Sequence, residues 1–152
     1  MVPGHAGLFC GPPPQNTLAQ GPQNAGNAVK ITAYTFIPKN IDPSKKYPLI
    51  VYVHGGVHSN FSTGGAHIIQ ELTSQGYLVI SPDYRGSTGY GEMHWKLIDY
   101  GGLEDEDVFE ARNWMVENEP LVDASRIGIM GWSHGGLITL MNLFNHPKSY
   151  NV

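Results

Sequence analysis

From Val29 onward, short apolar runs alternate with longer segments in which apolar residues recur at helical spacing. Val29–Ile37 alternates apolar and polar residues and is rich in β-branched side chains, which predicts a strand. Three further runs are continuous and apolar, as is typical of strands covered on both faces: Leu49–Val53, Tyr77–Ser81 and Arg126–Gly131. Longer segments with apolar residues at helical spacing predict helices over residues 66–74, 104–118 and 136–144. Strands that alternate with helices indicate the α/β class, with a mostly parallel sheet flanked by helices.

The first 28 residues differ from the rest of the chain. They contain no Asp, Glu, Lys or Arg, and they combine Pro12–Pro14 with scattered Gly, Gln and Asn. A segment of this composition buries too little apolar surface to form a core. We therefore expect a flexible leader over residues 1–28 and one α/β domain, or a portion of one, over residues 29–152.

Composition narrows the classes of function. The 152 residues include 9 basic and 13 acidic side chains, giving a net charge of −4, and no basic cluster occurs, so the sequence gives no support for nucleic-acid binding. No apolar stretch is long enough to cross a bilayer, and no membrane partner is expected. Cys10 is the single cysteine, so no internal disulfide is possible. A basic region followed by an apolar core, the pattern of a secretory signal, is not visible, and the compartment stays open.

The five residues from Gly131 to Gly135 match G-x-S-x-G, the pattern that places a serine on a sharp turn between a strand and a helix. The context fits, because a predicted buried strand precedes Ser133 and a predicted helix follows it. Ser133 is therefore a candidate nucleophile. The alternative is a glycine-rich turn whose serine only caps the helix.

Four segments carry a resemblance to a known family: residues 47–56 (YPLIVYVHGG), 76–91 (GYLVISPDYRGSTGYG), 123–128 (DASRIG) and 131–136 (GWSHGG). From about residue 30 to residue 150 the chain resembles the catalytic domain of the prolyl oligopeptidase family of serine peptidases, within the α/β-hydrolase fold. The Asp-Tyr-Arg-Gly-Ser loop is the most specific part. Trp132 makes the chain more similar to the dipeptidyl-peptidase and acylaminoacyl-peptidase branches than to prolyl oligopeptidase itself.

The resemblance implies roles for individual residues. Ser133 would attack the carbonyl of a peptide substrate and form an acyl-enzyme. The backbone N–H of His134 would be one oxyanion donor, and the N–H of Gly56 or Val57 the second. The His54 side chain is expected to order this loop rather than to act in the chemistry.

Three residues are candidates for substrate binding. Tyr84 and Arg85 follow the end of a predicted parallel strand, where such sheets place their ligands, and Trp132 precedes the nucleophile. The alternative for Tyr84 and Arg85 is a structural loop in which Arg85 bonds to backbone or to a carboxylate.

No metal and no cofactor are expected. His54 and His58 have a spacing that a metal site can use, but no third ligand accompanies them in the sequence. The glycines at 86, 89 and 91 are not in the order of a dinucleotide-binding loop, and no helix is predicted to start there.

The resemblance is incomplete at the catalytic triad, whose acid and base follow the serine in this fold. No Asp or Glu occurs after Ser133, and the histidines there are His134, the immediate neighbour, and His146, beyond the next helix. The chain is therefore expected to hold the N-terminal part of the catalytic domain, without the later strands, and to be inactive alone. The strand Arg126–Gly131 would then have an open edge through which the chain self-associates.

Two rival functions stay open. An esterase or acyl hydrolase of the same fold would use Ser133 in the same chemistry, although the loop from Asp83 to Gly91 favours a peptidase. A non-catalytic scaffold or binding module that kept the fold but lost the chemistry is the other, since fold does not determine function.

Overall fold

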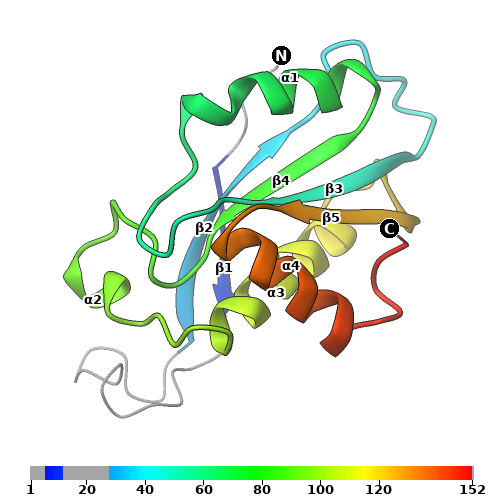
Figure 1. Ribbon diagram of the computed structural model, residues 1–152. Coiled ribbons are helices and arrows are strands. Elements are labelled where there is room, and N and C mark those ends of the chain that lie inside the picture. Colours follow the sequence, from blue (N-terminus) through cyan, green and yellow to red (C-terminus); the bar gives the residue numbers. More distant parts are fainter. Residues whose placement is uncertain (1–5, 12–27, 152) are drawn as a thin grey trace.

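The computed structural model describes residues 6–11 and 28–151. Its five strands form one sheet in the order β1-β2-β4-β3-β5 (Figure 1). The strands are β1 (Ala6–Gly11), β2 (Val29–Phe36), β3 (Tyr47–Val53), β4 (Leu78–Asp83) and β5 (Val122–Gly131). The helices are α1 (Ala66–Ser74), preceded by the 3₁₀ turn η1 (Thr63–Gly65), then α2 (Glu92–Trp95), α3 (Leu103–Asn118) and α4 (His134–Asn145).

The sheet is mixed. The strand β3 lies between β4 and β5 and is parallel to both, whereas β2 is antiparallel to β4 and to β1. The predicted α/β class is confirmed, with parallel strands joined by helical crossovers. The antiparallel pairings of β2 are a departure from the mostly parallel sheet that the sequence predicted.

The predicted leader overlaps a strand. Ala6–Gly11 forms β1 and pairs along its whole length with β2, from Ala6 opposite Tyr34 to Gly11 opposite Val29. The expectation of a leader does not hold for these six residues, because pairing with β2 satisfies a backbone whose own composition gives little reason to fold. Residues 1–5 and 12–27 of the expected leader lie outside the described part of the chain.

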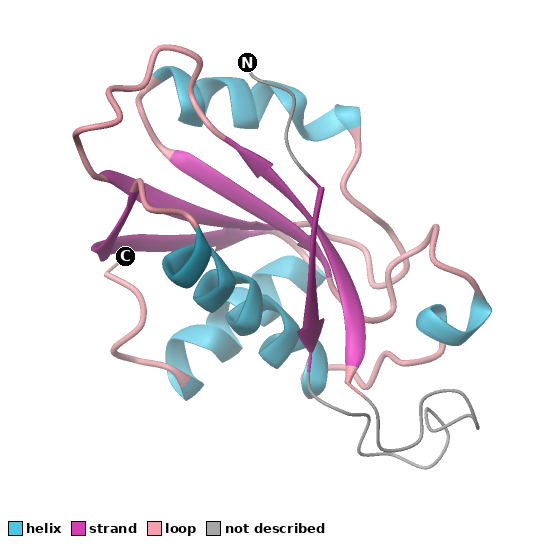
Figure 2. Ribbon diagram, turned by 180° about the vertical axis from the view of Figure 1, so that it is seen from behind, coloured by secondary structure: helices cyan, strands magenta, loops and turns pink. Residues whose placement is uncertain are grey.

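Helices cover both faces of the sheet (Figures 1 and 2). The helix α1 packs on one face, and α3 and α4 pack together on the other. Side chains of β4 alternate between the two faces of the sheet. Leu78 and Ile80 belong to the larger core beneath α3, while Val79 packs with Phe36 and with Ile69 of α1. All six residues of β4 are buried. The burial of residues 78–81 agrees with the predicted run Tyr77–Ser81, and the strand extends beyond that run to Pro82 and Asp83.

The strand β5 is the last of the sheet within the described residues, where it pairs with β3 alone. Its end at Gly131 leads directly into Ser133 and α4. The sheet therefore carries the predicted nucleophile at the carboxyl end of an edge strand, next to the carboxyl end of β3.

Candidate active site

Ser133 has a strained backbone. Its φ of 53° and ψ of −126° place a non-glycine residue in a region that L-amino acids rarely adopt, at a cost of about 1–3 kcal/mol. The residue lies between β5 and α4 and is exposed. The side chain makes no capping hydrogen bond to α4, so the alternative in which Ser133 only caps this helix does not fit the structure. The geometry is that of the strand–serine–helix turn that the motif predicted.

The glycines on either side of Ser133 allow this turn to form. A Cβ on Gly131 would lie 2.5 Å from the carbonyl oxygen of Gly135, and a Cβ on Gly135 would lie 2.6 Å from the carbonyl oxygen of His54. Real Cβ atoms do not approach backbone that closely. The two glycines therefore let β5, β3 and the start of α4 meet at one point.

The loop after β3 is fixed against the same turn. A Cβ on Gly55 would lie 2.8 Å from the backbone oxygen of Trp132, so the loop and the turn are in close contact. Gly56 has a φ of +76°, which favours glycine. The buried hydroxyl of Tyr84 lies 3.1 Å from the carbonyl oxygen of His54 and 3.3 Å from that of Gly56, and it donates to this pair.

The position of the Gly56 carbonyl determines where the next N–H, an expected oxyanion donor, points. In a trans peptide unit the C=O and the following N–H point in opposite directions. Since the Gly56 carbonyl points to the buried Tyr84, the N–H of Val57 points away from it. This orientation favours Val57 over Gly56 as the second donor.

His54 orders the loop, as the sequence analysis expected. Its Nδ1 lies 3.2 Å from the carbonyl oxygen of Gly55, its Nε2 lies 3.0 Å from Ser87 Oγ, and its ring stacks on Tyr84 at 4.3 Å. A neutral imidazole with its proton on Nδ1 satisfies both hydrogen bonds. Burial lowers the pKa of His54 to about 4, which keeps the ring neutral at physiological pH.

His134 contributes its backbone to the turn and its side chain to a buried pair. The ring is buried, and its Nε2 lies 3.3 Å from Glu104 Oε1 at the start of α3. Glu104 also accepts hydrogen bonds from the N–H groups of Gly101 and Gly102. Burial, with Asp99 close by, raises the pKa of Glu104 to about 7.

Sequence reasoning missed this role of Glu104. The sequence pattern placed Glu104 at the start of a predicted helix and gave it no further role. The carboxylate instead joins the loop before α3 to the residue that follows the nucleophile. No spacing in the sequence signals this contact, since 30 positions separate Glu104 from His134.

The prediction that Tyr84 and Arg85 bind substrate is corrected by their burial, since both side chains are fully buried. Arg85 donates to Asp107 through Nε at 2.8 Å and through a terminal guanidinium nitrogen at 2.6 Å. Neither residue offers a surface to a ligand. The structure therefore fits the alternative, a structural loop in which a carboxylate holds the arginine.

Trp132 is placed differently. It is 70 % exposed, and with Gly55 it lines a hollow of about 280 Å³ that extends to Tyr52 and His67. Its role in substrate binding stays a prediction.

His54 and His58, the two residues considered as metal ligands, both make other contacts. His58 Nδ1 lies 2.8 Å from the carbonyl oxygen of Gly86, and the ring stacks on Trp95 at 3.7 Å. With His54 bound to Gly55 and Ser87, the two rings serve to connect loops.

His146 cannot act as the base for Ser133. It caps the far end of the 12-residue helix α4, about 18 Å along the axis from Ser133. Within residues 134–151 no other side chain is of the type that completes a triad, apart from the neighbour His134.

None of the described helices combines the length and apolar character needed to span a bilayer.

Comparison with known proteins gives one consistent family. The model of the prolyl oligopeptidase family, Peptidase_S9, matches residues 63–152. The uncharacterized peptidase YuxL of Bacillus subtilis is 33 % identical over 115 residues, which are 74 % of this chain and 18 % of YuxL. Dipeptidyl-peptidase 5 of Aspergillus fumigatus is 35 % identical over 117 residues, which are 74 % of this chain and 16 % of that enzyme.

Two solved structures of peptidases are similar to this chain in fold. A puromycin-hydrolyzing peptidase of Mycobacterium tuberculosis superposes with a TM-score of 0.73 at 28 % identity, over 92 % of this chain and 20 % of that one. The acylaminoacyl peptidase of Pyrococcus horikoshii gives a TM-score of 0.73 at 23 % identity, over 97 % of this chain and 22 % of that one, and shows the same fold. The chain thus spans less than a quarter of the length of these relatives.

Proposed function

The chain belongs to the prolyl oligopeptidase family of peptidases, and from this premise we propose that it supplies the nucleophile and the oxyanion hole of a serine peptidase active site. The observation that carries the proposal is Ser133 itself, an exposed hydroxyl on a strained turn between β5 and α4. Strain of this kind persists only where the surrounding structure imposes it, and here the backbone packs so closely around the turn that a Cβ would not fit at Gly131 or Gly135.

The proposed chemistry is acyl transfer. Ser133 Oγ attacks the carbonyl carbon of a peptide bond and gives up its proton to a base, and the carbonyl oxygen becomes an oxyanion. The N–H groups of His134 and Val57 donate hydrogen bonds to that oxyanion. The tetrahedral intermediate then expels the amine, which takes up the proton, and leaves an acyl-enzyme that water hydrolyses.

The base and its orienting acid are proposed to lie outside these 152 residues. Without a base, Ser133 is an ordinary alcohol at neutral pH. Loss of a triad member leaves only about 10³–10⁴-fold catalysis over water. Residues 1–152 alone are therefore proposed to be inactive as a peptidase.

Peptides are the proposed substrates, since the relatives named above are peptidases. The loop that follows β4 supports this choice over an esterase. Its Asp-Tyr-Arg-Gly-Ser sequence is the most specific part of the resemblance to the peptidase family. In the structure Tyr84 donates a hydrogen bond to the loop after β3, and Arg85 binds Asp107 of α3. An esterase of the same fold is the second candidate, because acylation of Ser133 is the same reaction for both substrates.

The test uses a fluorophosphonate, which labels only activated serines. We expect residues 1–152 to label slowly, and a longer form that carries an Asp and a His after Val152 to label rapidly. Ser133→Ala should abolish the rapid labelling, while Ser125→Ala, an exposed serine on β5, should leave it unchanged. Hydrolysis of an aminoacyl amide by the longer form would support the peptidase, whereas hydrolysis of simple esters with no turnover of the amide would support the esterase. Rapid labelling that survives in Ser133→Ala would overturn the proposal.

A further inference from the structure

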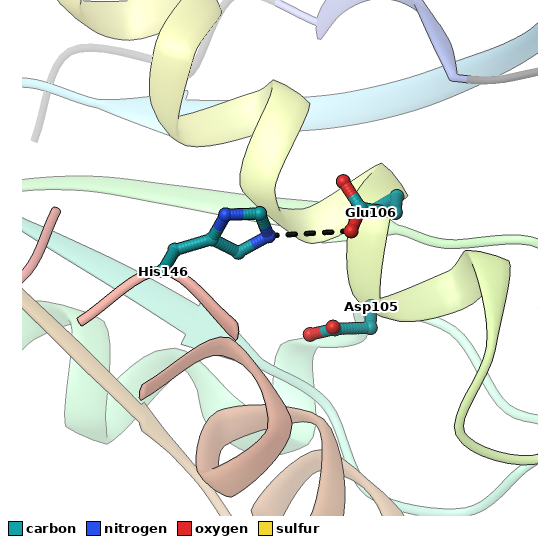
Figure 3. A group of neighbouring side chains, drawn as sticks. All are labelled: Asp105, Glu106 and His146. Carbon is teal, nitrogen blue, oxygen red and sulfur yellow. Dashed lines mark ion pairs between the residues drawn. The ribbon is translucent and has the colours of Figure 1, made fainter. Parts of the chain in front are cut away.

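Three side chains with metal-ligating atoms meet between α3 and α4 (Figure 3). Asp105 and Glu106 lie in the first turn of α3, and His146 caps the end of α4. One donor atom from each lies within 4.8 Å of the others. We propose that Asp105, Glu106 and His146 bind one divalent transition-metal ion of the Zn²⁺ type, which ties the two helices together.

The separation between two of the donors suits such an ion. His146 Nε2 lies 3.3 Å from Glu106 Oε1. Two ligand atoms that are each about 2.0–2.1 Å from a tetrahedral Zn²⁺ are about 3.3 Å apart. Glu106 is partly exposed, so its side chain has freedom to bring its oxygen closer to that of Asp105.

The imidazole nitrogen at this point has no hydrogen-bond partner. His146 Nε2 is shielded from solvent and, although close to Glu106, it makes no hydrogen bond of acceptable geometry. The ring is held in place by parallel stacking on Phe109, with centroids 3.6 Å apart and planes 2° apart. A fixed imidazole whose buried nitrogen makes no hydrogen bond is already oriented to bind a metal.

Neighbouring amides orient the carboxylate of Asp105. The side-chain N–H groups of Asn142 and Asn145, both on α4, donate to its two oxygens. Carboxylate ligands in metal sites are commonly held in this way by residues around them. Each carboxylate oxygen has a second lone pair, which leaves Asp105 able to bind a cation.

Charge also favours a cation here. Asp105 and Glu106 bring two carboxylates to the first turn of α3. Burial raises the pKa of Asp105, because its charge is poorly solvated. A divalent ion neutralises both carboxylates, and with three protein ligands it would retain a water molecule in its fourth position.

The proposed site lies at the opposite end of α4 from Ser133, so it takes no part in the proposed acyl transfer. It does not depend on the proposed peptidase function. The competing explanation is a simple ion pair between a protonated His146 and Glu106, which requires no metal.

Titration calorimetry of residues 1–152 with ZnCl₂ at pH 7.5 tests the proposal. We expect one equivalent of Zn²⁺ to bind and the thermal unfolding midpoint to rise. His146→Gln and Glu106→Gln should each weaken binding at least tenfold. His67→Gln, an exposed histidine on α1, is the matched control and should bind as the native chain does.

Glu106→Gln keeps the test decisive if His146→Gln disturbs the packing on Phe109. It changes a partly exposed side chain, and circular dichroism verifies that it is folded. Absence of stoichiometric binding by the native chain would overturn the proposal. Equal Zn²⁺ affinity in Glu106→Gln and His67→Gln would overturn it as well, since the ion would then bind elsewhere.

Discussion

Removal of the Asp107 carboxylate should destabilise this protein more than the loss of any surface charge. Arg85 and Asp107 are both fully buried, and the carboxylate accepts three hydrogen bonds from Arg85: from Nε at 2.8 Å, from a terminal nitrogen at 2.6 Å and from the backbone N–H at 2.9 Å. Asp107→Ala removes all three acceptors at once. It leaves a guanidinium charge without this carboxylate in a part of the core that water does not reach.

The magnitude follows from the burial. Breaking a buried ion pair by removing one partner costs about 3–5 kcal/mol, because the remaining charge has lost its solvation and its compensation. Total unfolding free energies are about 5–15 kcal/mol, so the variant should lose a large share of its stability. The double variant Arg85→Met, Asp107→Leu removes both charges and should recover at least half of the loss.

Urea unfolding followed by tryptophan fluorescence measures these differences. Asp123→Ala is the control, since it breaks an exposed ion pair with Arg126 and should not shift the midpoint measurably. A loss below about 1 kcal/mol in Asp107→Ala would refute the reasoning from burial. If the single variant does not fold, recovery of a cooperative transition in the double variant carries the test, and an equally unfolded double variant would refute it.

Three further outcomes are expected. Gly135→Ala should fail to fold or lose several kcal/mol, since its Cβ would lie 2.6 Å from the His54 carbonyl oxygen; circular dichroism and urea unfolding would show it, and native-like stability would contradict the elbow geometry. Stability should fall as the pH decreases from about 6.5 to about 4, because His54 takes up a proton near its ordinary pKa of 6.5 in the unfolded chain but only near 4 in the folded chain. The loss in unfolding free energy reaches about 3 kcal/mol. A His54→Gln variant with the same pH dependence would exclude this cause. The chain should self-associate through the edge of β5, and Met130→Lys should shift light scattering toward the monomer; a native chain that is monomeric at high concentration would contradict this.

Local pattern determined much of this protein. The continuous apolar runs predicted β3, β4 and the later part of β5, and helical spacing predicted α1 with the bounds that the structure has. These features are readable because burial on both faces excludes polar residues from a strand, and burial on one face imposes a 3.6-residue period on a helix. The turn at Ser133 was predictable from its glycines, since a Cβ does not fit where two backbones meet.

Contacts between distant segments were decided by the tertiary structure. The apolar composition of Ala6–Gly11 is no stronger than that of many loops, and it becomes β1 only because β2 offers an unpaired edge. Arg85 reads as a surface residue in isolation, and its burial depends on Asp107, 22 positions later. Glu104 beside His134, and Asp105 and Glu106 beside His146, follow from the packing of α3 on α4. Such pairs follow no periodic pattern in the sequence. A buried charge is stable only beside its partner, and folding brings the two residues together.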